Sequence, residues 1–149
     1  MRILLLLMLL QSVQLLANDK YQFYRKNLAL APNDKALCFS MMEELVNHKN
    51  DEKAKGYLGA YTMISANHVF SPIQKLKSFN KGKDALEKSI VQLPKDVELR
   101  YVRYAIQISI PKFLGYKNNI QTDKKWMMEQ LPHSDKKLQT DIRTLLKLN

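Results

Sequence analysis

The feature that most constrains the fold is the spacing of apolar residues, which recur three or four positions apart through most of the chain. In the stretch GKDALEKSIVQLPKDVELRYVRYAIQI, residues 82–108, this spacing continues on both sides of Pro94. Such a period matches one face of an α-helix, and proline ends a helix because it has no amide hydrogen. Only 4 Gly and 5 Pro are present, and no run of alternating β-branched residues competes. The sequence therefore predicts an all-α fold of six or seven antiparallel helices.

Helix boundaries are expected where capping residues and prolines interrupt the apolar stripes. The first helix should end near Pro32, and Asn33 or Asp34 should cap the second. Ser71 followed by Pro72 is typical of a helix start, because proline in the first turn loses no hydrogen bond. A helix over 97–110 is apolar on two sides, so we expect it to pack between two layers. The expected segments cover about 18–32, 33–46, 54–68, 71–93, 97–110 and 120–131, with a seventh after Pro132.

The first seventeen residues, MRILLLLMLLQSVQLLA, differ from the rest of the chain. Arg2 precedes an unbroken apolar run over residues 3–10, and Ala17 is a suitable last residue before a cleavage. This order is that of a secretory signal, whereas a membrane span needs about twenty apolar residues. We therefore expect an exported protein, periplasmic or secreted, whose mature part is a single domain at residues 18–149. Leu15 is large where a small residue is preferred, so a retained N-terminal membrane anchor stays open as the alternative.

A second pattern lies in the opening stretch itself. Gly82, Leu86, Ser89 and Pro94 have the small–large–small–proline spacing of a helix pair, in which the small residues let a neighbouring helix approach. This spacing resembles the second helix of a tetratricopeptide repeat, and the resemblance implies right-handed packing of helical hairpins over residues 82–108. The preceding segment lacks the aromatic–Leu–Gly–Tyr positions of such a unit, and the prolines are unequally spaced. The expectation is a tetratricopeptide-like helical domain and not a regular array.

Three longer segments carry a further resemblance. FNKGKDALEKSI, ELRYVRYAIQ and PKFLGYKNNI are similar to segments of uncharacterised exported proteins of Bacteroidetes. That resemblance implies a lineage and no activity.

Local motifs for catalysis are missing from the sequence. His48, His68 and His133 lie far apart, no HExxH or GxSxG is present, and Cys38 is the single cysteine. Glycine-rich phosphate loops are also lacking. No catalytic, cofactor-binding or metal-binding residue is predicted, and the protein is not expected to be an enzyme. A small enzyme whose site is assembled from distant residues would leave no local motif, so it stays as the third alternative.

The charge is strongly basic, with 24 Lys and Arg against 14 Asp and Glu, a net charge of +10. The first interpretation of this charge is a soluble polar surface, and two others stay open: docking to an anionic membrane or polymer, and binding an acidic partner. The export signal disfavours nucleic acid, so such a partner is not expected. Packing is the first assignment for Tyr104. Two assignments are considered for the aromatic residues of FLGY: a plug at the end of the bundle, which is preferred, or the mouth of a groove. The candidate interaction surface consists of Arg100, Arg103, Tyr104, Phe113 and Tyr116.

Together these features predict a non-catalytic exported helical domain that mediates interaction with a protein or peptide partner. The alternative is a basic periplasmic or surface-associated protein that docks to an anionic membrane or polymer. Salt dependence would separate the two, because salt screens charge-driven binding.

Overall fold

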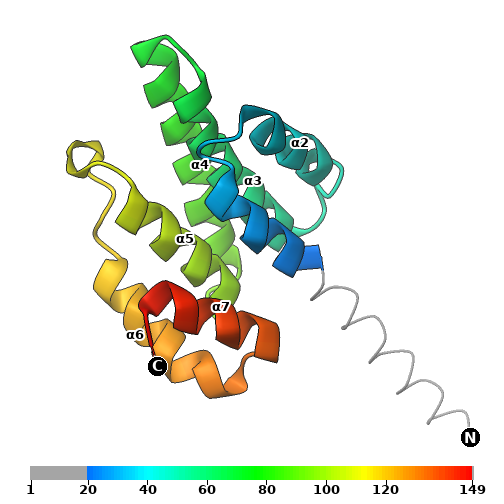
Figure 1. The fold of residues 1–149 in the computed structure, drawn as a ribbon, viewed down its shortest axis with the longest axis vertical. Coiled ribbons are helices and arrows are strands. Elements are labelled where there is room, and N and C mark those ends of the chain that lie inside the picture. Colours follow the sequence, from blue (N-terminus) through cyan, green and yellow to red (C-terminus); the bar gives the residue numbers. More distant parts are fainter. Residues whose placement is uncertain (1–19, 149) are drawn as a thin grey trace, which may run out of the picture.

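A computed structural model describes residues 20–148, and all regular structure within this range is helical (Figure 1). The all-α prediction is confirmed for these residues. An N-terminal helical segment covers residues 20–30. The expected signal at residues 1–17 lies outside the described residues. The helices that follow are α2 (Lys35–Val46), α3 (Glu52–Ser65), α4 (Pro72–Gln92), α5 (Val97–Ser109), α6 (Ile120–Gln130) and α7 (Lys136–Leu146).

Helix boundaries follow the capping residues closely. Asp34 caps α2 through a hydrogen bond from the Leu37 amide at 2.9 Å, and Ser71 with Pro72 begins α4. The last helical residue of α5 is Ser109, just before Pro111. Gly115 has a φ of 64°, the left-handed conformation that lets the chain turn toward α6. These local signals therefore placed the helices along the chain correctly.

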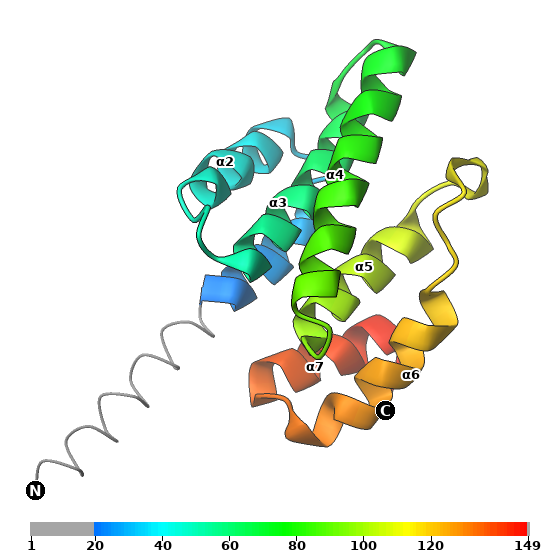
Figure 2. The same cartoon turned by 180° about the vertical axis from the view of Figure 1, so that it is seen from behind.

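The longest helix, α4, packs antiparallel against α3 (Figure 2). Gly59 on α3 and Gly82 on α4 face each other, and a Cβ atom at position 82 would lie 2.4 Å from the carbonyl oxygen of Gly59. Leu86 and Ser89 are buried nearby, whereas Pro94 is exposed in the turn that follows α4. Gly82 therefore lies at a backbone contact that no other residue could make.

Aromatic rings join the N-terminal helical segment to α3. Tyr24, Tyr57 and Tyr61 are fully buried, and the ring centroids of Tyr24 and Tyr57 are 5.6 Å apart. Tyr21 stacks on Tyr57 at 5.7 Å. The hydroxyl of Tyr61 donates to the backbone carbonyl of Tyr24 at 2.8 Å. This packing holds the N-terminal helical segment across α3, where it forms one side of the groove described below.

Helix α5 packs between two layers, as its two apolar sides predict. On one side Leu99, Val102 and Ile106 join the larger apolar core, built with the N-terminal helical segment, α2, α3 and α4. On the other side Tyr104 joins a smaller core with α6 and α7. Tyr101 packs against both cores. Helix α5 therefore connects the two halves of the structure.

Candidate functional site

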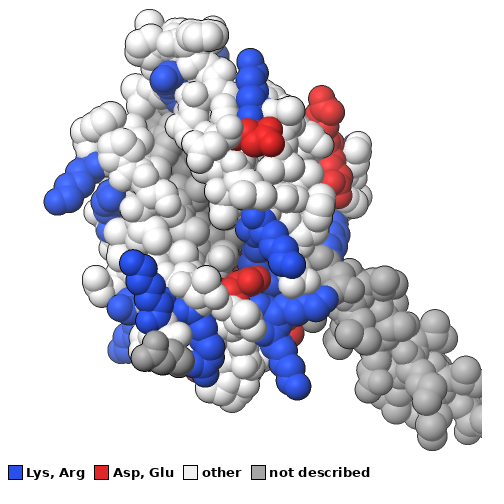
Figure 3. All heavy atoms as spheres, viewed as in Figure 1, with Lys and Arg blue, Asp and Glu red and all other residues white. Residues whose placement is uncertain are grey.

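An apolar groove of about 940 Å³ runs alongside α5. The N-terminal helical segment and α5 form its two sides and run in the same direction (Figure 1). The rest of the lining comes from the end of α3 and the turn that follows it, the first turns of α4, the turn after α5, and Leu145 on α7. Figure 3 shows a hollow on this face whose visible lining is mostly free of charged residues. Its apolar residues include Leu28, Ile64, Leu76, Phe79, Ala105 and Ile110.

Large apolar side chains lie exposed at the end of the groove that adjoins α4. Phe113 lines the groove and is 85% exposed, and Leu76 lines it and is also exposed. Ile73 in the first turn of α4 and Phe70 just before that helix are also exposed, although neither lines the groove. Exposed apolar residues are ordinary when scattered, but a cluster beside a concave surface is typical of a binding site.

At the opposite end, next to α7, the groove is lined by Arg25, whose side chain is almost completely buried. Its Nε donates to Asp141 Oδ2 at 2.7 Å, and its Nη1 donates to Glu98 Oε1. The third nitrogen, Nη2, is buried and has no hydrogen-bond partner among the described residues. Burial lowers the pKa of Arg25, but the Glu98 carboxylate and the hydrogen bonds to both acids outweigh burial and raise it above its ordinary value. Arg25 is therefore a fixed cation.

The carboxylate of Glu98 also interacts with two residues of α3. Tyr57 donates its hydroxyl to Glu98 at 2.6 Å, and Lys53 lies 3.7 Å from Glu98 and 2.7 Å from Asp96. Burial and the Glu98 charge raise the pKa of Tyr57 well above its ordinary value, so this phenol stays neutral. The sequence offered no sign of this network, because its members come from helices far apart in the chain.

Arg103 of the candidate interaction surface belongs to an internal network, and its prediction as a surface residue is wrong. Arg100 joins the same network but keeps 20% of its side chain exposed. Arg103 is only 3% exposed and donates to Asp123 through two nitrogens, both at 2.7 Å. It also binds Glu87 at 2.7 Å, and Arg100 binds Asp123 at 3.1 Å. Asp123 on α6 is fully buried, and a buried carboxylate needs paired cations. The pair of arginines on α5 supplies them.

The aromatic residues of that predicted surface divide between core and groove. Tyr104 is buried against α6 and α7, and Tyr116 is buried with its hydroxyl bonded to Glu87 and its ring edge-on to Phe79 at 6.1 Å. The preferred plug assignment is therefore correct for Tyr116. It is wrong for Phe113, which the short turn after α5 carries to the groove.

Groups for metal or thiol chemistry do not assemble in the part of the chain that the structure describes. No three His, Cys, Asp or Glu residues among residues 20–148 lie close enough to hold a metal ion. Burial raises the pKa of the Cys38 thiol to about 11, so this cysteine is not an activated nucleophile. Within the same range, no helix is both long and apolar enough to cross a membrane.

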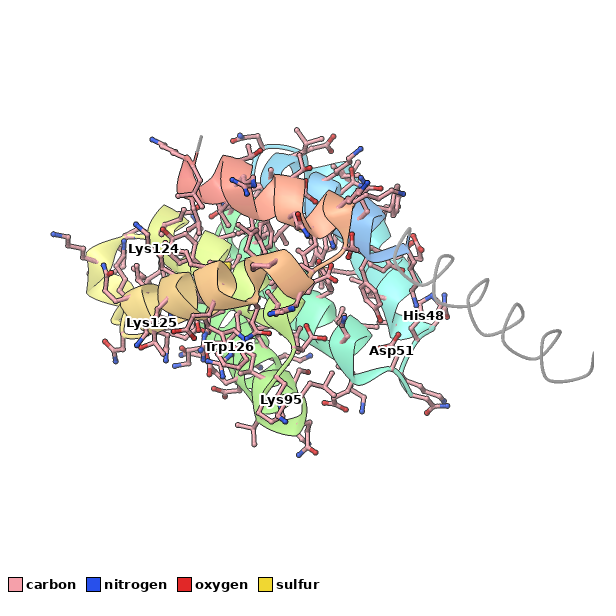
Figure 4. All side chains as sticks on the ribbon, turned by 90° about the horizontal axis from the view of Figure 1, so that it is seen from below. His48, Asp51, Lys95, Lys124, Lys125 and Trp126 are labelled. Atoms are coloured by element: carbon pink, nitrogen blue, oxygen red, sulfur yellow. The ribbon has the colours of Figure 1, made fainter. Side chains whose placement is uncertain are left out.

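Basic residues gather away from the groove as well as beside it. Figure 4 shows Lys124, Lys125 and Trp126 along α6, and Lys95 in the turn between α4 and α5. His48 and Asp51 lie at the other side of this view, between α2 and α3. Lys and Arg side chains are also prominent in the lower part of Figure 3, where Figure 1 shows α6 and α7. The positive charge is therefore spread over several helices and is not concentrated at one site.

No family model, curated protein or solved structure matches this chain. The resemblances to a tetratricopeptide repeat and to exported proteins of Bacteroidetes therefore stay predictions.

Proposed function

We propose that this protein is a non-catalytic helical domain that binds a peptide, or a segment of a partner protein, in the groove beside α5. The observation that carries the proposal is the groove itself, with a volume of about 940 Å³ and a mostly apolar lining. Binding sites in proteins are concave, mainly apolar and usually preformed. This groove is preformed because buried tyrosines fix one side and two apolar cores fix the other.

The exposed residues at the α4 end support a macromolecular partner. Phe113 and Leu76 line the groove and are still 85% and 52% exposed, so a large partner seated in the groove would bury more of both side chains. Aromatic residues at the edge of a recessed surface commonly act as anchors for protein partners.

Tetratricopeptide-like packing is part of the same proposal. The close contact of Gly59 and Gly82 pairs α3 with α4, and α5 follows as the first helix of a further hairpin. Stacked helical hairpins with a right-handed turn produce concave surfaces that bind peptides. Export through the segment at residues 1–17 is also proposed, and it would place the partner outside the cytoplasm.

The basic charge favours a second candidate function, docking to an anionic membrane or polymer. Lys124 and Lys125 on α6 and Lys95 in the turn between α4 and α5 are not among the groove-lining residues. The two functions respond differently to salt. Charge-driven docking should weaken steeply when salt is raised, whereas binding in an apolar groove should change little.

The test is selection of peptides from a random phage-displayed library, followed by binding to a blocked variant. Ala29 is exposed and lines the groove, so Ala29→Trp should fill the groove without disturbing the core. Ala36→Trp on α2 is the matched control, since Ala36 is also exposed on a helix and does not line the groove. We expect Ala29→Trp to weaken binding about tenfold or more, and Ala36→Trp to leave it unchanged. Equal affinities for the two variants would show that the groove is not the binding site.

A further inference from the structure

We infer that the protein docks on an anionic lipid bilayer through the end of the molecule where α4 begins. Phe70 and Ile73 enter the bilayer interface, and Lys77 and Lys81 contact lipid phosphates. These four residues are called the α4 surface below. The inference goes beyond peptide binding and rests on the second candidate function, because it gives membrane docking a defined surface.

The first step is a pair of large apolar side chains at the start of α4 that neither the core nor the groove uses. Phe70 is 98% exposed and Ile73 is 81% exposed, and neither lines the groove. Figures 1 and 2 both show the start of α4 at one end of the longest axis of the molecule. A flat surface placed against this end can therefore cover both side chains. Exposed apolar residues that lie together at a protruding end are typical of contact with a membrane or a protein.

The second step is the charge around these residues, which is basic. The sequence has no Asp or Glu between Glu52 and Asp84. Lys77 and Lys81 are exposed, and no ion pair is found for either among the described residues. They follow Ile73 at spacings of four, so the three residues lie on one stripe of α4. In Figure 3 this end of the molecule is uncharged at its extreme, with Lys and Arg side chains just below.

The third step is the match between this stripe and the layers of a bilayer. Lys77 lies about 6 Å and Lys81 about 12 Å from Ile73 along the helix, at 1.5 Å per residue. Apolar side chains of interfacial segments are buried roughly 5–10 Å into the boundary between headgroups and acyl chains. With Ile73 at that depth and α4 upright, both ammonium groups reach the phosphate layer, because lysine side chains extend along apolar surfaces toward polar groups. Lysines in that layer are attracted by anionic lipids.

Charge also decides between a bilayer and a second copy of this chain. Two copies that met through the α4 surface would bring the lysines of one against the lysines of the other, and like charges across an interface oppose association. An anionic bilayer supplies an apolar layer for Phe70 and Ile73 together with negative charge for Lys77 and Lys81. The bilayer is therefore the partner that suits both halves of the α4 surface.

The first experiment measures binding of the full chain and its variants to vesicles of phosphatidylglycerol and phosphatidylcholine by sedimentation. Phe70→Ser combined with Ile73→Ser should weaken binding about tenfold or more, since two apolar side chains no longer enter the interface. Lys77→Gln combined with Lys81→Gln should weaken it about tenfold at low salt. Val91→Ser is the matched control, because Val91 is 72% exposed near the other end of α4, and it should bind like the parent. Unchanged binding in both double variants would overturn the inference.

The second experiment locates the contact. Cys38 is buried, so a cysteine introduced at an exposed position can be labelled selectively with the polarity-sensitive fluorophore NBD. The label on Ile73→Cys should brighten and shift to the blue when the anionic vesicles are added, whereas the label on Val91→Cys should not. Both labelled proteins carry residues 1–17, so a difference between them reports which end of α4 meets the bilayer. An unchanged label on Ile73→Cys would overturn the inference even if the protein bound vesicles. A blue shift that grows with protein concentration without vesicles would overturn it in favour of a second copy.

The remaining outcomes separate this inference from the proposed functions. Vesicle binding that is lost only in Lys124→Gln combined with Lys125→Gln would overturn the α4 surface and keep the second candidate function. Absence of vesicle binding would overturn membrane docking altogether, while peptide binding in the groove still stood. Ala29→Trp should leave vesicle binding unchanged, because the α4 surface does not line the groove. Loss of vesicle binding in Ala29→Trp would overturn the inference in favour of a lipid held in the groove.

Discussion

Replacement of Gly82 by alanine should destabilise the protein, although alanine is the better helix former. A Cβ atom at position 82 would lie 2.4 Å from the carbonyl oxygen of Gly59 and 2.5 Å from the amide nitrogen of Met63. Both are backbone atoms, so rotation of a side chain cannot relieve the contact. Ordinary contact begins near 3.4 Å, which would require α3 and α4 to separate locally by about 1 Å.

The expected magnitude follows from two opposing terms. Overpacking a well-packed core costs about 1–3 kcal/mol, and the upper end applies here because backbone must move. The higher helix propensity of alanine offsets about 1 kcal/mol of this cost. The net loss in the free energy of unfolding is therefore about 2 kcal/mol, or roughly 8 °C in Tm for a domain of this size.

The assay is urea and thermal unfolding followed by circular dichroism, with Lys81→Ala as the control. Lys81 is exposed on the same helix, one position away, so its replacement should change the free energy of unfolding by less than about 0.5 kcal/mol. Gly59→Ala should resemble Gly82→Ala, because the Cβ would meet the Gly82 carbonyl oxygen at 2.7 Å. A Gly82→Ala protein as stable as the parent would refute the backbone contact between α3 and α4.

Further expectations concern single side chains. Asp123→Asn should cost about 3 kcal/mol in urea unfolding, because it removes the fully buried carboxylate that pairs with Arg103 and Arg100 and leaves Arg103 only Glu87; an unchanged midpoint would contradict the buried network. Burial raises the pKa of Asp51, but hydrogen bonds from Tyr21 and Ala54 and the charge of Lys20 lower it overall. The contribution of the Asp51 carboxylate to folding stability is present above the unfolded-state pKa of about 3.9 and is lost as pH falls through the lower folded-state value. Asp51→Asn should therefore make Tm depend less on pH in the acid range. Cys38 should react with a thiol reagent only after urea unfolds the protein, since its thiol is buried with a pKa of about 11; rapid reaction of the folded protein would contradict this. Phe113→Ser should leave Tm within about 2 °C of the parent and weaken binding of the selected peptides, because Phe113 is exposed and lines the groove; a large fall in Tm would place Phe113 in the core.

Much of the candidate site could not be predicted, because its residues meet only in the folded chain. Phe113 was recognised as a candidate for a groove mouth, from two aromatic residues on either side of a glycine turn. Arg25 carried no such sign, since its partners Glu98 and Asp141 lie 73 and 116 residues away. For Arg103 the prediction failed in the opposite way. Arginine next to tyrosine on a helix suggested an exposed surface, but Arg103 is buried because it pairs with the buried Asp123 on α6.

The sequence by itself determined the all-α class, the order of the helices and most of their ends. Those properties depend on interactions within a few residues: apolar spacing, a capping side chain at Asp34 or Ser71, and a proline such as Pro111. It also indicated that a neighbouring helix approaches closely at Gly82. Only the tertiary structure decided which faces became core, which charges were buried and where a groove remained. Those outcomes depend on how helices distant in the chain pack, and local spacing carries no information about which distant helix supplies the partner.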